Sequence, residues 1–322
     1  MRPRLLILMA ALLLASPFWL PNSGAENLPT FEDFRSSDRE RRATGQRETV
    51  DSLRLMHVDL VRVARVATEN PKDPEVLWGA AELGGDWSTA LAAGGTNAVV
   101  ALRFACARAV KHDYVTALHW LRYCESHDVG NLVPWLGELW VLRQQGQTPE
   151  SFHPPESATA YRDYAVPAAR ARVRVLEKAG YSPYSARRIG LMRNTFVESM
   201  AQDLSRDSVA QKSTAPFLLK VARAMQSRLT FLITELVGES LERAVLTSQP
   251  ERKVEVAETR LQEIDDRREQ LKQLVADTEQ RTADFTTEAE MVQYFDDVLS
   301  FGEEIAMKRL QLTVQRGVLQ PR

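Results

Sequence analysis

The fold is decided by the stretch from Asn97 to Gly146, which reads NAVVALRFACARAVKHDYVTALHWLRYCESHDVGNLVPWLGELWVLRQQG. Apolar residues recur in it at steps of three and four, as they do along one side of a helix. Asn97 and Asp113 have side-chain oxygens that can cap the first turns of two helices, and Pro134 suits the first turn of another. Gly146 suits the end of that last helix. The stretch therefore predicts two antiparallel helices followed by a third.

The segment from Asp113 to Leu121, DYVTALHWL, is similar to the second helix of a tetratricopeptide (TPR) unit, which typically reads D-Y-x-x-A-L-x-x-[LYF]. Asn97 and Asn131, at the starts of the first and third predicted helices, are 34 residues apart, the length of one such unit. Cys124 and Val129 depart from the family, which usually has Ala and Pro there. The resemblance covers only the quoted stretch. It implies a stacked helical surface that binds peptide segments of other proteins and has no chemistry of its own.

The chain begins with the features of an export signal. Arg2 and Arg4 precede the apolar run Leu5–Leu14, and Ser23-Gly24-Ala25 has the small residues that signal peptidase recognises. We expect residues 1–25 to be a signal peptide, cleaved after Ala25, and the mature protein to be periplasmic or secreted. An uncleaved anchor is the alternative, but prolines interrupt the apolar run, which is shorter than the ~20 residues that span a bilayer. We expect no integral membrane segment once the signal is removed.

The charge balance of the chain argues against nucleic acid as its partner. Removing the signal takes two arginines from the 41 basic side chains, which leaves 39 against 43 acidic ones and a formal net charge of −4. Nucleic-acid-binding domains are instead basic. The partner that we expect is another envelope or secreted protein.

Helical periodicity throughout, without alternating runs of Val, Ile and Thr, predicts an all-α fold. Residues 26–48 are polar and charged, so we expect a flexible leader there. A TPR-like array of helical hairpins should follow at 49–207. From 208 to 322, apolar residues alternate at steps of four and three, which predicts a bundle of long helices or a coiled coil.

The C-terminal region should contain three long helices, at 215–246, 251–285 and 287–318. Short turns between them favour an antiparallel bundle. The competing arrangement is an intermolecular coiled coil through 251–285, which would make the protein a homodimer.

Two clusters of side chains are candidate binding sites. Tyr114, Trp120 and Trp135 lie on the predicted hairpin, and aromatic residues of this kind often anchor protein partners. Between residues 160 and 193 there are eight basic and two acidic side chains. That cluster predicts either a site for an anionic small molecule or lipid headgroup, or a solvated or intramolecular face. Its candidate residues are Arg170, Arg172, Arg174, Arg187 and Arg188.

The sequence contains none of the common catalytic or nucleotide-binding motifs, such as G-x-S-x-G, H-E-x-x-H or G-x-x-x-x-G-K. His119, Cys124 and His127 are close in sequence, but no second pair of metal ligands accompanies them. We therefore expect no catalytic residues, no metal site and no cofactor. An enzyme without a recognisable motif is the alternative.

Cys106 and Cys124 are the two cysteines, and an oxidising compartment favours a disulfide between them. If the hairpin turns near His112, however, the two residues are offset along the helices by ~9 Å, more than the ~7 Å between alpha carbons that a disulfide tolerates. The alternative is a pair of buried thiols.

Overall fold

The computed structural model describes residues 28–44, 55–94, 97–147, 152–191, 196–226, 231–248, 254–283 and 287–318. Every regular element within these ranges is a helix, so the prediction of an all-α protein is confirmed. The predicted signal peptide, residues 1–25, lies outside the described residues. Among the described helices, none has both the length and the apolar character needed to cross a membrane.

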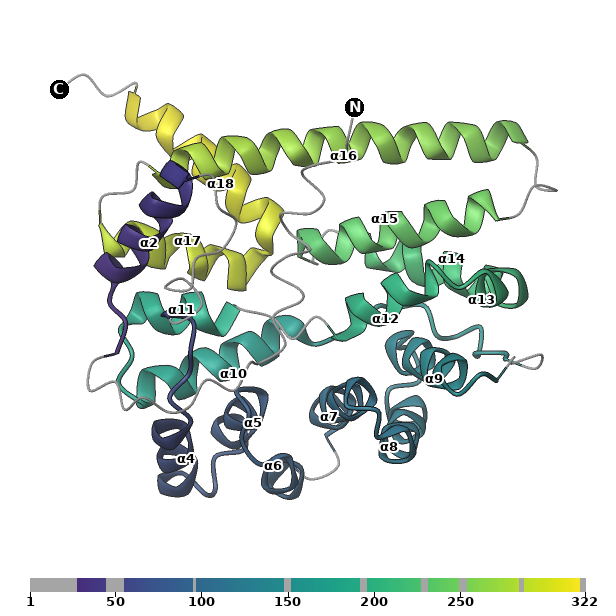
Figure 1. The fold of residues 1–322 in the computed structure, drawn as a ribbon, viewed down its shortest axis with the longest axis horizontal. Helices are drawn as coiled ribbons and strands as arrows, with labels where there is room; N and C mark the ends of the chain where they lie inside the picture. The colour runs from purple at the N-terminus through teal and green to yellow at the C-terminus, as the bar shows by residue number, and fades with distance from the viewer. Residues whose placement is uncertain are drawn as a thin grey trace. The chain divides into compact units, whose positions relative to one another are not determined.

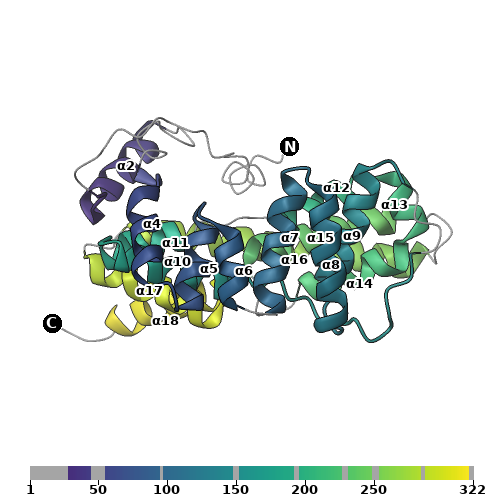
Figure 2. The same ribbon diagram turned by 90° about the horizontal axis from the view of Figure 1, so that it is seen from below.

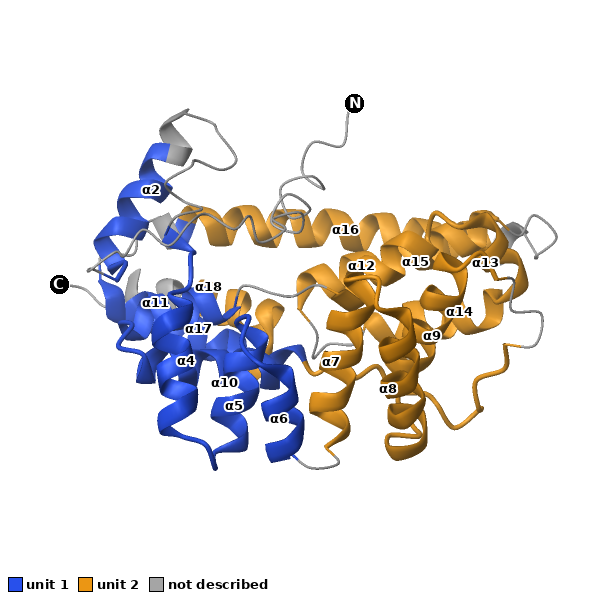
Figure 3. Ribbon diagram, turned by 60° about the horizontal axis from the view of Figure 1, so that its bottom comes forward, with its two compact units in different colours: residues 1–94, 165–194, 281–299 blue, residues 95–164, 195–280, 300–322 orange. Residues whose placement is uncertain are grey.

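The helices group into two compact units, each assembled from three separate segments of the chain (Figure 3). Unit 1 comprises residues 1–94, 165–194 and 281–299, and unit 2 comprises residues 95–164, 195–280 and 300–322. The predicted domain boundaries at residues 48 and 207 stay predictions, because a compact unit need not fold independently.

Unit 1 is built around one central helix. Its described helices are α2 (Phe31–Thr44), α4 (Leu60–Glu69), α5 (Pro74–Glu82), α6 (Trp87–Gly94), α10 (Ala165–Lys178), α11 (Pro183–Leu191) and most of α17 (Glu288–Phe301). Helix α10 packs against α4, α5 and α11. The backbones of α5 and α10 come close together, since a Cβ added to Gly79 would lie 2.2 Å from the carbonyl oxygen of Ala171.

The segment 26–48, predicted as a flexible leader, contains helix α2. Phe34 is only 1% exposed, and its ring meets that of Tyr184 edge-on with centroids 5.6 Å apart. Arg188 donates to both carboxyl oxygens of Asp38, at 2.8 and 2.9 Å. Tertiary contacts of one buried aromatic ring and one ion pair thus stabilise the helix, although its sequence is mostly polar.

Unit 2 contains the predicted hairpin. Its described helices are α7 (Ala98–Val110), α8 (Tyr114–His127), α9 (Val133–Gln144), α12 (Phe196–Leu204), α13 (Ser208–Ser213), α14 (Ala215–Met225), α15 (Leu232–Thr247), most of α16 (Val254–Ala283), and α18 (Glu303–Val318). Figure 2 shows α7, α8 and α9 side by side, and each packs against the next.

The predicted caps of the hairpin are confirmed. The Asn97 side chain accepts a hydrogen bond from the N–H of Val99 at 2.9 Å, and that of Asp113 accepts one from the N–H of Thr116 at 3.3 Å. Gly146 ends the third helix with a φ of +71°, a left-handed conformation that glycine adopts at little cost. Local sequence therefore sets the ends of these helices.

The long helices predicted after residue 208 are formed only in part. Helix α16 spans 30 residues, within the predicted 251–285. The helix predicted at 215–246 is instead two helices, α14 and α15, which pack against each other. Gly238 permits this, since a Cβ there would lie 2.7 Å from the carbonyl oxygen of Ala222. The last predicted helix is divided at Gly302, where φ is +87°.

Candidate functional site

The predicted protein-binding residues lie on different sides of the hairpin. Tyr114 meets Trp140 of α9 edge-on, with ring centroids 6.2 Å apart. Trp120 instead meets Phe104 of α7 edge-on, with ring centroids 6.0 Å apart. Trp135 packs against Phe152 at 6.2 Å. Tyr114, Trp120 and Trp135 are each half-buried, and the structure does not bring them together into one patch.

The outer face of α8 carries the exposed residues of the hairpin. Val115 is 80% exposed, unusually high for a large apolar side chain, and His119 and Arg122 are exposed on the same side of the helix. Trp120 and Tyr123 border this face with ring centroids 5.4 Å apart. We call these five residues the α8 face. It combines an aromatic border with an exposed apolar centre, features common in protein-binding surfaces.

The five candidate anion-binding arginines all have partners within unit 1. Arg170 donates to the carbonyl oxygen of Leu299 at 2.7 Å, and Arg174 pairs with Glu75 and, at 2.7 Å, with Asp73. Arg187 lies 2.6 Å from both Glu177 and Asp296, and Arg188 pairs with Asp38. These contacts tie together segments that are far apart in the sequence. An anion would have to compete with them, and the predicted anion site stays a prediction.

Arg172 is the most buried of the five. Its side chain is 4% exposed and lies 2.9 Å from Glu82, whose side chain is 0% exposed. It also donates to the carbonyl oxygen of Gly190 at 2.9 Å. This ion pair joins α10 to α5 and α11 in the interior of unit 1.

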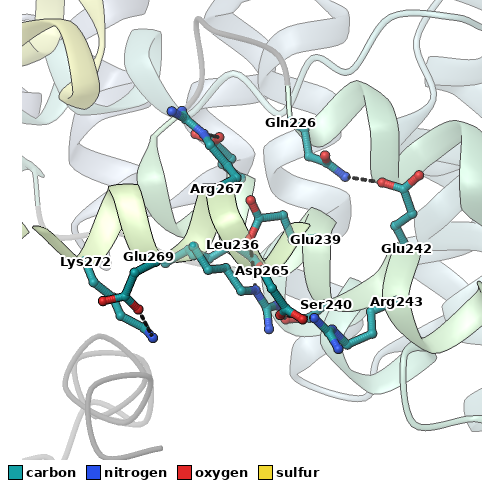
Figure 4. Close-up of polar contacts among 12 residues, drawn as sticks. Gln226, Leu236, Glu239, Ser240, Glu242, Arg243, Asp265, Arg267, Glu269 and Lys272 are labelled. Carbon is teal, nitrogen blue, oxygen red and sulfur yellow. Dashed lines mark hydrogen bonds and ion pairs between the residues drawn. The ribbon is translucent and has the colours of Figure 1, made fainter. Parts of the chain in front are cut away.

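The second polar cluster of interest, which the sequence did not single out, lies between α15 and α16. Glu235, Glu239 and Glu242 follow one another on α15 at steps of four and three, and they are 8%, 1% and 0% exposed. Arg267, Arg268 and Arg260 of α16 lie 2.7, 2.9 and 2.9 Å from these three carboxylates, in that order. We call these six residues the charged seam. Figures 1 and 4 show α16 running alongside α15 at this cluster.

Additional donors satisfy the seam carboxylates. Gln226 donates to Glu242 at 2.8 Å, the contact marked by a dashed line in Figure 4, and Arg223 of α14 lies 3.1 Å from it. Burial raises the pKa of Glu242, but hydrogen bonds from Arg260, Gln226 and Arg223 outweigh that effect, so its pKa lies below the usual range. Burial dominates at Glu239 and raises its pKa despite Arg268. Most of the seam is therefore a set of satisfied ion pairs.

The sequence contains one signal that could have found the seam. Arg268 interrupts the apolar stripe of α16, and in the structure Ile264 and Leu271 on either side of it are 1% and 2% exposed. An arginine at such a position requires a buried carboxylate opposite it. The predicted homodimer through 251–285 stays a prediction. Ile264 and Leu271 of this stripe are, however, already buried within the single chain.

Cys106 and Cys124 are buried thiols of unit 2. The Cys124 Sγ lies 3.6 Å from the carbonyl oxygen of Ala98, and burial, followed by the neighbouring Cys106, raises its pKa. His119 and His127 are exposed, whereas Cys124 is 1% exposed, so the three do not converge as metal ligands. In the part of the chain that the structure describes, no group of three or more His, Cys, Asp or Glu side chains is arranged to hold a metal ion.

Comparisons with family models, with curated proteins and with solved structures found no match for this chain.

Proposed function

We propose that this protein is an exported, non-enzymatic helical scaffold that binds another protein of the cell envelope or the extracellular space through the α8 face. The observation that supports this most directly is the exposure of Val115, 80%, beside the rings of Trp120 and Tyr123. Tyr and Trp are enriched among the residues that dominate binding energy at protein interfaces.

The rest of the polar chemistry supports a scaffold. The buried charges described above pair with one another between helices: Arg172 with Glu82 in unit 1, and the charged seam in unit 2. Such pairs fix helix positions and leave the groups occupied. The TPR resemblance of the 97–146 stretch points in the same direction, since such repeats bind peptide segments.

Site-specific photo-cross-linking in the producing cell tests the proposal. A photoreactive phenylalanine analogue replaces Val115 in the full-length protein, and the cross-linked partner is identified by mass spectrometry. The same analogue at Val209 of α13, which is 41% exposed, is the matched control. We expect one defined adduct from position 115 and none of that mass from position 209.

A second pair of variants measures the contribution of the surface to binding of the partner identified in this way. Val115→Asp should weaken binding at least tenfold, about 1.4 kcal/mol, whereas Val209→Asp should leave the affinity unchanged. The same adduct from both positions, or equal affinities of the two variants, would refute the assignment to the α8 face.

The exported location has its own test. The secreted or periplasmic protein should begin at Glu26, because the small residues of Ser23-Gly24-Ala25 suit signal peptidase. N-terminal sequencing of the protein from the cell exterior or periplasm checks this. Retention of residues 1–25 in a membrane fraction would support the anchor instead.

A further inference from the structure

Two glutamates meet where α8 packs against α9. Glu125 lies near the end of α8, and its carboxyl group is within hydrogen-bonding reach of Glu138 on α9. The Glu138 side chain is 11% exposed and accepts a hydrogen bond from Arg122 at 3.0 Å. The guanidinium of Arg122, which is 61% exposed, is thus the one positive charge in the described part of the chain that acts on both carboxyl groups.

The carboxyl group of Glu125 is poorly satisfied as an anion. Its Oε1 atom is buried and has no hydrogen-bond partner among the described residues. Burial, followed by the charge of Glu138, raises the pKa of Glu125 from the usual 4.5 to about 8, and Arg122 only partly opposes this. Two adjacent carboxyl groups with so little compensation are stable when one of them holds a proton.

The remaining titratable groups near this pair do not replace that compensation. Asp128, which follows the end of α8, is bound by Arg162 at 2.5 Å and by the hydroxyl of Tyr164 at 2.6 Å. The thiol of Cys124 also lies near Glu125, and burial followed by Cys106 of α7 raises the pKa of Cys124, so this thiol supplies no positive charge. Arg162 is already engaged by Asp128, so Arg122 is the cation that opposes protonation of Glu125, and it is outweighed by burial and by Glu138.

We propose that Glu125 and Glu138 share one proton and form a proton-dependent lock that holds α8 against α9. With the proton, the two carboxyl groups form a hydrogen bond across the helix interface. Without it, two carboxylates repel each other there, and Oε1 of Glu125 becomes a buried anion without a donor. The lock requires no binding partner, so its test is independent of the proposed function.

The sign of the pH dependence follows from the folded-state pKa, which is higher than that of the unfolded chain. The stabilisation is complete below about pH 4.5 and is lost as the pH rises toward about 8. The mature protein should therefore lose on the order of 5 °C in Tm between pH 5.5 and 8.5, beyond the change shown by a variant without the pair.

The test compares Tm against pH for the mature wild type, Glu125→Gln, Glu138→Gln and the control Glu258→Gln, whose residue is exposed on α16. Gln at either position of the pair should flatten the curve, and the control should follow the wild type. Arg122→Gln should move the midpoint to higher pH, because Arg122 lowers the pKa of Glu125. A group with only a packing role would not shift that midpoint.

Infrared spectroscopy reports the proton directly, even if one variant folds poorly. The wild type should lose one protonated-carboxyl band between pH 6.5 and 9.5, and this band should be missing from Glu125→Gln. Two results would overturn the proposal. One is the same slope of Tm against pH in the wild type and in both pair variants, and the other is a wild type without a protonated carboxyl group above pH 6.5.

Discussion

The ion pair inside unit 1 and the charged seam of unit 2 use the same two residue types in different settings. Arg172 and Glu82 are both nearly inaccessible and lie where the backbones of α5 and α10 touch at Gly79. In the seam, the carboxylates are buried but the arginine side chains of α16 remain 14% to 33% exposed.

This difference in exposure determines how each set of ion pairs affects the packing of the helices. A fully buried pair is costly to desolvate and tolerates no missing partner, so it specifies one packing of the helices. Partly exposed arginines keep part of their hydration and respond to dissolved ions. The α5–α10 interface should therefore be rigid, whereas the attachment of α16 should depend on solution conditions.

The largest effect is expected at the buried pair. Arg172→Ala leaves Glu82 without its cation and should lower the free energy of unfolding by about 3–5 kcal/mol. Chemical denaturation followed by circular dichroism measures this. Replacing both residues, as Arg172→Met with Glu82→Leu, should recover most of the loss, because two apolar side chains leave no buried charge. A single variant as stable as wild type would show that the pair is not buried as described.

A smaller effect is expected in the seam. Arg268→Ala removes the cation from Glu239 and should cost about 2 kcal/mol, since water can reach part of the site. Lys272→Ala is the matched control, because Lys272 pairs with Glu269 on the same helix at the surface, where both side chains are well exposed. The control should stay within about 0.5 kcal/mol of wild type. Equal losses for both variants would remove the distinction between the seam and an ordinary surface pair.

The smallest effect is the response to salt. Raising NaCl to 1 M reduces the screening length to about 3 Å, so amide exchange along the middle of α16 should accelerate roughly threefold. The amides of α10 beside Arg172 should not change. Hydrogen exchange with mass spectrometry, at both salt concentrations, measures the two helices in one experiment. Equal acceleration of α10 and α16 would contradict the contrast.

Sequence patterns predicted the local features well. Asn97, Asp113 and Gly146 begin or end helices as expected, because caps and left-handed glycines act within one turn of chain. The periodicity of α16 was likewise predicted, because a heptad stripe is a local pattern.

The failures concern contacts between distant segments. Residues 26–48 gave no sign of α2, because its burial depends on Tyr184 and Arg188, which are more than a hundred positions away. The helix predicted at 215–246 is two, since Gly238 matters only once α14 and α15 lie together. The predicted anion site at the arginines of 170–188 stays a prediction, but the carboxylates that pair with these arginines are scattered along the chain. No local pattern could have identified those partners.

The interleaving of the two units has a consequence for the order of folding. Unit 1 receives its last segment, residues 281–299, only after the whole of residues 95–164 and 195–280, which belong to unit 2, has been made. Arg187 and Arg170 bind Asp296 and the carbonyl oxygen of Leu299 in that segment. A chain that emerges from its N-terminus first cannot complete this unit until that segment has been made, so the packing of residues 1–94 and 165–194 stays incomplete up to that point.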